Sequence, residues 1–220
     1  MQARVTLREA LEAAKRVGVC AQALTEISRM ADWDEFSRHR NAPYWAYWYA
    51  CNVAQGQVRD MEPIIARDPE FAYRYARHVV LGRWPQGEPA IAQDPEWAWR
   101  YAKHVISGRW PLGEPTIAQD PEWAWRYASD VIRGRWPEAE SVIAADTYCA
   151  YCYAYLVLHR RWPEAEPVIA RDPAWAYRYA RHVIGGRWPE AEPTIAHNPK
   201  WACRYAIDVL RGPWPEAEVA

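Results

Sequence analysis

The sequence predicts an all-α protein: an α-solenoid of stacked two-helix repeats that begins with an N-terminal helical cap. One observation behind this prediction is a fixed period, because tryptophans recur every 26 residues, at Trp84, Trp110, Trp136, Trp162, Trp188 and Trp214. The other is that each period combines an Asp-Pro or related turn with apolar residues at helical spacing. Periods of about 20 to 50 residues are typical of arrays in which each repeat packs on its neighbours.

The first 31 residues do not follow the period and are predicted to form the helical cap. Thr6 followed by Glu9 is a capping box, in which each side chain bonds the other residue's backbone N–H. A helix is expected from there to Gly18, and a second from about Cys20 to Met30. Such a pair would cover the apolar face that the first repeat leaves open.

The rest of the chain divides by the period. Residues 32–57 form a degenerate repeat that has lost its Trp-Pro motif, and residues 58–213 hold six repeats. Residues 214–220 form a C-terminal half repeat without a visible polar cap. An uncovered end of this kind would allow homo-oligomerisation.

The repeat at residues 84–109 shows how one unit is expected to fold. Asp94 is a good N-cap and Pro95 suits the first helical position, so a helix of about 13 residues starts here. We expect Gly108 to end it in the left-handed conformation. Its apolar stripe is Ala98, Tyr101, Ala102, Val105 and Ile106.

The first half of this repeat is expected to be a shorter helix. Pro85 and Pro89 both lie in the motif Trp-Pro-x-x-Glu-Pro, and a long helix through both is not expected because proline is tolerated only in a first turn. We therefore expect about two turns ending near Ala92, with Glu88 near the positive N-terminal end.

Some positions carry the same residue in almost every repeat and are expected to hold the stack together. A tyrosine fills volume and requires a partner for its hydroxyl. The tyrosines are Tyr49, Tyr75, Tyr101, Tyr127, Tyr153, Tyr179 and Tyr205. A glutamate position, which includes Glu88, and an arginine position, which includes Arg100, predict a network of ion pairs between repeats.

Composition limits the possible partners and the compartment. The formal net charge is −1, which disfavours a dedicated nucleic-acid binder. The five cysteines are an odd number, which favours a reducing compartment. No signal peptide or membrane-spanning stretch is visible, so the cytoplasm is the expected location.

The sequence motif of the repeat has a recognisable pattern. Gly-Arg-Trp-Pro-Glu-Ala-Glu-Pro, followed by Asp-Pro-x-Trp-Ala-Tyr-Arg-Tyr-Ala, resembles short helical-hairpin repeats in proteins of bacteria, bacteriophages and large DNA viruses. Those repeats commonly read Gly-Arg-Phe-Pro-Glu-Gly-Glu and Asp-Pro-x-Tyr-Ala-Tyr. The resemblance covers about residues 32–220. It implies a repeat architecture and a phage or prokaryotic origin, but no activity.

The motifs that could carry out chemistry are better explained by structural roles. Cys149 and Cys152 have only His159 nearby, whereas a metal site needs about four ligands. They replace Trp and Arg of other repeats, which favours packing over metal or redox chemistry. No phosphate loop, nucleophile elbow or acid–base pair stands out, so neither catalysis, a cofactor nor a metal is expected. An enzyme would require a pocket near residues 144–160 or beside the N-terminal cap.

Aromatic residues supply the candidate binding sites. Positions such as 97 and 99 differ by about 200° around a helix, so one row is expected in the core and the other exposed. The candidates in the second row are Trp99, Trp125 and Tyr177, together with the neighbouring Arg100 and Arg126. The divergent repeat 136–161 adds Tyr148, Tyr151 and Tyr155, which either form a specific binding stripe or reflect drift of the repeat.

These features favour a non-enzymatic scaffold that binds another protein, such as a phage or bacterial modulator. One alternative is a binder of single-stranded nucleic acid or nucleotides through stacked Trp and Arg. Another is a self-assembling structural protein.

Overall fold

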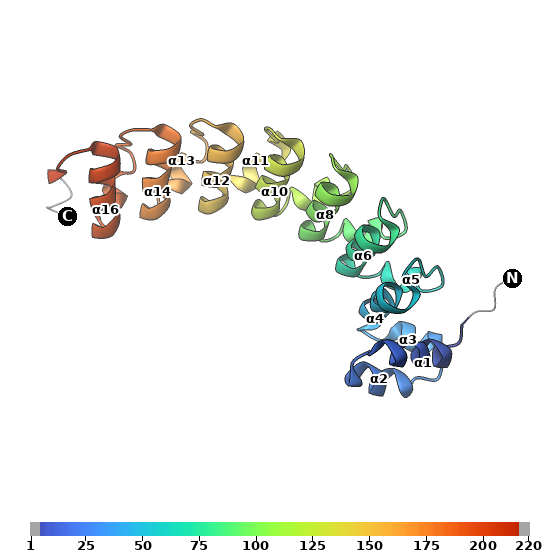
Figure 1. Cartoon of the computed structure of the whole chain (residues 1–220). Coiled ribbons are helices and arrows are strands. Elements are labelled where there is room, and N and C mark those ends of the chain that lie inside the picture. Colours follow the sequence, from blue (N-terminus) through green and yellow to red (C-terminus); the bar gives the residue numbers. More distant parts are fainter. Residues whose placement is uncertain (1–4, 216–220) are drawn as a thin grey trace. The chain divides into compact units, whose positions relative to one another are not determined.

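Residues 5–215 are described by a computed structural model in which every regular element is a helix. The chain divides into two compact units, one up to Thr116 and one from Ile117. In the first unit α4, α6 and α8 lie side by side, and in the second α10, α12, α14 and α16 do so (Figure 1). The predicted all-α class with repeated helix pairs and an N-terminal helical region is therefore confirmed.

The N-terminal region contains α1 (Leu7–Val17), α2 (Ala21–Ser28) and α3 (Trp33–Arg38). The expected capping box is present: the Thr6 hydroxyl accepts the N–H of Glu9, whose carboxylate accepts the N–H of Thr6 at 2.7 Å. Gly18 ends α1 with φ 90°. Residues 1–4 of the predicted cap lie outside the described residues.

Each later repeat pairs a short helix with a long one. The long helices of the first unit are α4 (Ala42–Tyr49), α6 (Pro69–Tyr75) and α8 (Pro95–Tyr101), continued by η1 (Ala50–Ala54), η2 (Ala76–Val80) and η3 (Ala102–Ile106). Those of the second are α10 (Pro121–Tyr127), α12 (Thr147–Tyr153), α14 (Pro173–Tyr179) and α16 (Pro199–Tyr205), continued by η4 (Ala128–Ile132), η5 (Ala154–Leu158), η6 (Ala180–Ile184) and η7 (Ala206–Leu210). The short helices are α5 (Glu62–Ile65), α7 (Glu88–Ile91), α9 (Glu114–Ile117), α11 (Pro137–Ile143), α13 (Glu166–Ile169) and α15 (Glu192–Ala196).

The long helix starts as expected but ends differently. The Asp94 side chain caps α8 by accepting the N–H of Trp97. The last turn, η3, is π-helical, and the N–H groups of Ser107 and Gly108 both bond the carbonyl of Ala102. The left-handed residue is Ser107, with φ 58°, so the prediction of Gly108 there is wrong. The π-helical turn ends at Ile106, so Ser107 is the residue that closes it in the left-handed conformation.

The short helix is shorter than expected where a second proline is present. Pro89 must lie in the first turn, so α7 begins only at Glu88 and spans 4 residues. In the divergent repeat Ser141 occupies this position, and α11 starts at Pro137 and spans 7 residues. The predicted two turns therefore form only where the second proline is missing.

A buried tyrosine joins the two helices of each repeat. The Tyr101 hydroxyl accepts the N–H of Trp84 at 2.9 Å and donates to the Glu88 carboxylate at 3.0 Å. Arg83 donates two further hydrogen bonds to Glu88, at 2.7 and 3.2 Å. The tyrosine bonds recur at Tyr75, Tyr153, Tyr179 and Tyr205. The prediction that this tyrosine has a hydroxyl partner is confirmed at these five positions.

Successive repeats meet through the same tyrosines. The rings of Tyr101 and Trp110 are 4.8 Å apart, and those of Tyr153 and Trp162 are 5.1 Å apart. Arg100, by contrast, pairs with Glu96 of its own helix at 2.8 Å. The predicted network between the glutamate position and the arginine position does not form at these residues, because Glu88 faces the core and Arg100 faces outward. Arg100 pairs within its own helix, and Glu88 pairs with Arg83, the last residue of the preceding repeat.

Candidate functional site

The divergent helix α12 carries an exposed aromatic surface. Asp146 caps this helix by accepting the N–H of Cys149, so the helix forms although Thr147 replaces the usual proline. Tyr148, Tyr151 and Tyr155 follow at i, i+3 and i+7 and therefore share one face. Tyr148 is 39% exposed and Tyr155 is 42% exposed, whereas Tyr151 is half-buried.

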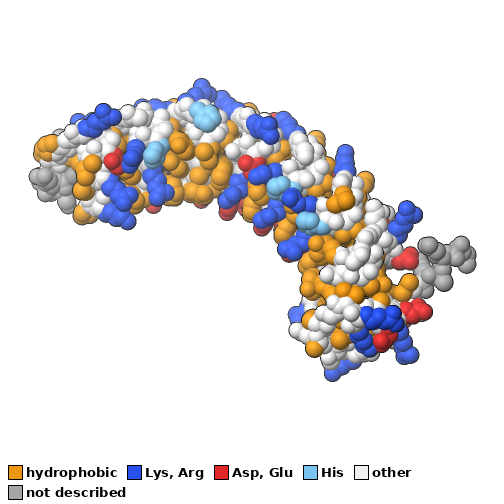
Figure 2. Space-filling view, in the orientation of Figure 1, with side chains coloured by type: hydrophobic (Ala, Val, Ile, Leu, Met, Phe, Trp, Pro, Cys, Tyr) orange, Lys and Arg blue, Asp and Glu red, His pale blue; other side chains and the backbone are white. Residues whose placement is uncertain are grey.

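We call Tyr148, Tyr151, Tyr155 and the neighbouring Leu156 the α12 patch. Leu156 is 42% exposed and occupies the position of His104 and His182 in other repeats. Figure 2 shows hydrophobic side chains gathered over α12, with Lys and Arg side chains over the neighbouring α14 and α16. Contiguous exposed apolar side chains on a soluble protein typically mark a contact surface.

Ring contacts link the α12 patch to both neighbouring repeats. The Tyr148 ring lies 6.3 Å from Trp125 of α10 and 5.1 Å from Trp175 of α14. Trp175 is also 5.3 Å from Tyr151, and Tyr155 stacks on Tyr151 at 5.9 Å. The sequence-predicted tyrosines are thus brought together, and they are held by a surface that spans three repeats.

The other predicted aromatic candidates lie in the buried row. Trp99 is 7% exposed, Trp125 is 8% exposed and Tyr177 is 3% exposed. The reason is visible at Tyr177, whose ring stacks at 5.6 Å with Trp201 of the following repeat. The row that includes Trp97 is only half-buried. The sequence leaves open which of the two rows is exposed. In the structure the Trp99 row is the buried one, so these three candidate binding residues contribute to packing.

The two predicted arginines are held beside these indoles and beside carboxylates. The Arg100 guanidinium lies 5.2 Å from the Trp97 ring and pairs with Glu96. Arg126 lies 5.0 Å from the Trp125 ring and pairs with Glu122 at 3.0 Å. Their charges are therefore largely compensated within their own helices.

Two further arginines, which are not among the binding residues predicted from the sequence, lack this compensation. Arg178 lies 4.4 Å over the Trp175 ring, and Arg204 lies 5.3 Å over the Trp201 ring. Within residues 5–215 neither has a carboxylate partner. The signal in the sequence is the position four residues earlier, where Ala174 and Lys200 replace glutamate.

The paired cysteines of α12 lie on its buried side. Cys149 and Cys152 are buried free thiols, and burial raises the pKa of both. In the described part of the chain, no group of three or more His, Cys, Asp or Glu side chains could hold a metal ion. The two thiols are therefore protonated packing residues at neutral pH.

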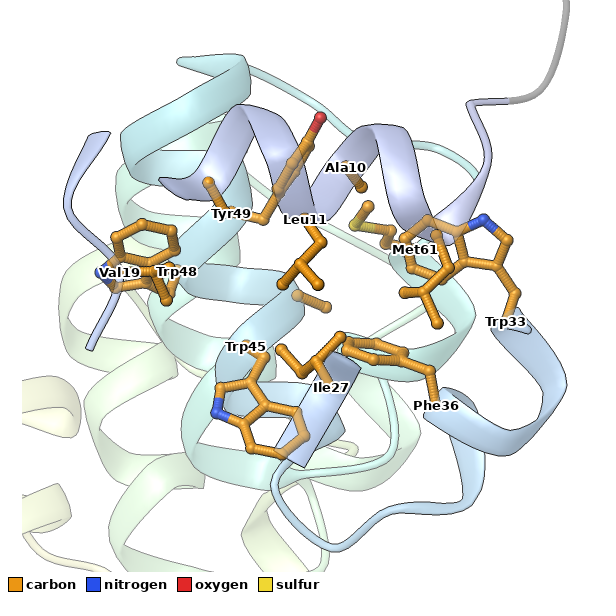
Figure 3. Close-up of a pocket in the computed structure, with 13 residues that line it drawn as sticks. Ala10, Leu11, Val19, Ile27, Trp33, Phe36, Trp45, Trp48, Tyr49 and Met61 are labelled. Atoms are coloured by element: carbon orange, nitrogen blue, oxygen red, sulfur yellow. The ribbon is translucent and has the colours of Figure 1, made fainter. Parts of the chain in front are cut away.

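A small apolar cavity lies inside the N-terminal region. It measures about 40 Å³ and is lined by side chains such as Leu11, Ile27, Phe36, Trp45 and Met61, which point toward one another (Figure 3). A space of this size is a packing gap in the core and is too small for an organic ligand.

A larger open cleft, of about 700 Å³, lies nearby beside Trp33, Asp34, Arg59 and Asp60. Its described lining includes neither a histidine nor a cysteine. It therefore presents no nucleophile–base pair of the kinds that use these residues.

Comparisons with known proteins complete the description. No family model, no curated protein and no solved structure matches the chain. Among residues 5–215, no helix is long and apolar enough to cross a membrane.

Proposed function

We propose that the protein is a non-enzymatic repeat scaffold that binds another protein through the α12 patch. The observation that carries the proposal is the break in periodicity at α12. In place of Glu96 and Lys103 of a regular repeat, α12 and its continuation η5 expose Tyr148 and Tyr155. Tyrosine is enriched in protein interfaces because it combines a large apolar area with a hydroxyl that can hydrogen-bond.

The setting of the patch supports this role. Trp175 and Tyr151 hold the exposed rings in place, so little side-chain freedom is lost when a partner binds. The resemblance to repeats of bacteria, phages and large DNA viruses supports the finer proposal of a phage or bacterial modulator acting on another protein.

The proposal is tested by selecting binders from a random peptide library. The wild type is compared with a variant that carries the regular-repeat residues: Tyr148→Glu, Tyr151→Trp and Tyr155→Lys. We expect the selected peptides to bind this variant at least about tenfold more weakly. Tyr44→Glu is the matched control, since Tyr44 occupies the same repeat position in the first unit and is 44% exposed.

The control should leave peptide binding unchanged within about twofold. Circular dichroism and the thermal midpoint establish that each variant is folded. Equal binding to the wild type and to the folded triple variant would overturn the proposal.

A further inference from the structure

The arginines that recur in the long helices differ in whether a glutamate pairs with them. Arg74, Arg100 and Arg126 each pair with a glutamate one turn earlier in the same helix, at 2.7, 2.8 and 3.0 Å. In α14 and α16 that glutamate is replaced by Ala174 and Lys200. A local positive charge therefore remains beside the α12 patch and not at these three earlier arginines.

These cations also lie over aromatic rings. Arg178 lies over the Trp175 ring, while Arg204 and Lys200 lie over the Trp201 ring, with Lys200 at 4.9 Å. Stacking on an indole orients a cation without neutralising it. Each charged group therefore lies beside an aromatic ring on this side of the second unit.

The carboxylate that follows Arg204 by four residues is already engaged by other side chains. Asp208 already pairs with Arg181 at 2.5 Å and accepts a hydrogen bond from Tyr177. Trp175 connects the charge to the patch, because its ring contacts Tyr148 and Tyr151 on one side and Arg178 on another. Aromatic and cationic groups therefore adjoin over α12 and α14, and α16, which packs on α14, adds Arg204 and Lys200.

From this charge pattern we infer that the partner segment is acidic: a peptide whose carboxylates meet Arg178, Arg204 and Lys200 and whose apolar side chains cover the α12 patch. The inference rests on the proposed protein-binding function and names the chemistry of the partner. Charge complementarity of this kind selects partners and accelerates association.

A protein segment fits this surface better than a nucleic acid does. Among the residues that the structure describes, Arg178, Arg204 and Lys200 are the cations of α14 and α16 without a carboxylate partner, and the formal net charge of the chain is −1. Nucleic-acid strands carry a phosphate at every nucleotide and require a track of cations for binding at physiological salt. A short acidic segment with apolar side chains requires only a few cations beside an apolar area.

The test uses peptides of defined sequence, together with variants that add or remove the glutamate partner of an arginine. The acidic probe is a fluorescein-labelled peptide of repeating Glu-Glu-Leu-Phe, and the basic probe has Lys in place of Glu. A third probe is an oligothymidylate of similar length. We expect the acidic peptide to bind the wild type at least about tenfold tighter than the basic peptide.

The double variant Ala174→Glu, Lys200→Glu gives Arg178 and Arg204 the partner that Arg100 has. It is expected to weaken binding of the acidic peptide about tenfold without lowering the thermal midpoint. Arg178→Gln with Arg204→Gln provides a second route to the same loss. The matched control, Glu70→Ala with Glu96→Ala, exposes arginines in the first unit and should change binding by less than about twofold.

Three results would overturn the inference: no binding of the acidic peptide to the folded wild type, equal binding to the double variant, or tighter binding of the oligothymidylate. The proposed function fails on a different result, which is equal binding of library peptides to the wild type and to the folded tyrosine variant. If library peptides depend on Tyr148 and Tyr155 but not on Ala174→Glu, Lys200→Glu, the scaffold proposal stands and the acidic partner does not.

Discussion

The regular repeat 84–109 and the divergent repeat 136–161 share an interior and differ at the surface. The hydroxyl of Tyr101 lies 3.0 Å from Glu88, and that of Tyr153 lies 2.9 Å from Glu140. Outward from this interior, every large polar residue of α8 is replaced in α12 by an aromatic residue or a cysteine. The comparison teaches that the tyrosine bonds and ring contacts specify the repeat, which leaves the outer positions free to carry binding.

The strongest test of the shared interior is removal of one hydroxyl from each repeat. Tyr101→Phe and Tyr153→Phe should each lower the free energy of unfolding by about 2–3 kcal/mol, because a buried backbone N–H and a carboxylate both lose a partner. Urea unfolding followed by circular dichroism measures this. Tyr155→Phe, at an exposed ring, should change it by less than about 0.5 kcal/mol. Clearly unequal losses at the two core tyrosines would break the comparison.

Thiol reactivity sharpens the difference between the two repeats. Burial raises the pKa of Cys149 and Cys152, whereas Cys20 and Cys203 are exposed. With Ellman's reagent in native buffer, the buried pair should react at least about a hundredfold more slowly than the exposed pair. Cys149→Trp with Cys152→Arg, the residues of repeat 84–109, should remove two slow equivalents and leave the fast phase unchanged. Rapid labelling of all five thiols would contradict the buried placement.

Acid titration tests whether the glutamates of the two repeats are equivalent. Arg83 and Arg135 hold the pKa values of Glu88 and Glu140 below the ordinary value. A carboxyl with a lowered folded-state pKa contributes stability above its unfolded pKa of about 4.3, and this contribution is lost as pH falls through the lower folded value.

Urea midpoints measured from about pH 6 to about pH 3 should therefore fall below about pH 4.3. In Arg83→Met and Arg135→Met the carboxyl pKa rises, so the pH-dependent loss should become smaller by a similar amount in both variants. If the urea midpoints of both variants depend on pH as those of the wild type do, these ion pairs do not determine the loss of stability at acid pH.

The smallest expected effect concerns the end of the long helix. Ser107 and His159 adopt φ 58° and 51°, a region that disfavours side chains, whereas the equivalent residue of another repeat is Gly185 with φ 72°. Ser107→Gly and His159→Gly should each raise the free energy of unfolding by about 0.5–1 kcal/mol. Gly185→Ser should lower it by a similar amount, as measured by chemical denaturation. If glycine raises the free energy of unfolding at one of Ser107 and His159 and lowers it at the other, the two helix ends are not equivalent.

Local rules predict much of this structure from the sequence. Asp-Pro steps start the long helices as expected, and the repeated tyrosine has the hydroxyl partner that a buried phenol requires. The end of the helix was not predictable, because nothing in Ala102–Ile106 distinguishes a π-helical turn from an α-helical one. Placing Gly108 in the left-handed region was the consequence.

The candidate site was only partly predictable for a similar reason. The divergence at Tyr148 and Tyr155 is visible in one repeat. Whether Trp97 or Trp99 is covered depends on the helix packed against them, and one helix's periodicity does not contain that information. The missing carboxylate partner of Arg178 can be recognised only by comparison with the ion pairs that Arg100 and Arg126 form in the structure.

The hydrogen-bonded tyrosine at the centre of each repeat has a consequence for how such a gene can change length. Within one repeat, Tyr179 bonds only to residues of its own 26-residue block, the N–H of Trp162 and the carboxylate of Glu166. The following block presents the same type of tryptophan, since Tyr153 meets Trp162 as Tyr179 meets Trp188. Recombination that removes one whole period, residues 162–187, would bring Tyr153 against Trp188 and re-create an existing junction. Unequal crossing-over can therefore shorten or lengthen this array in whole blocks while the surface of each block diverges independently.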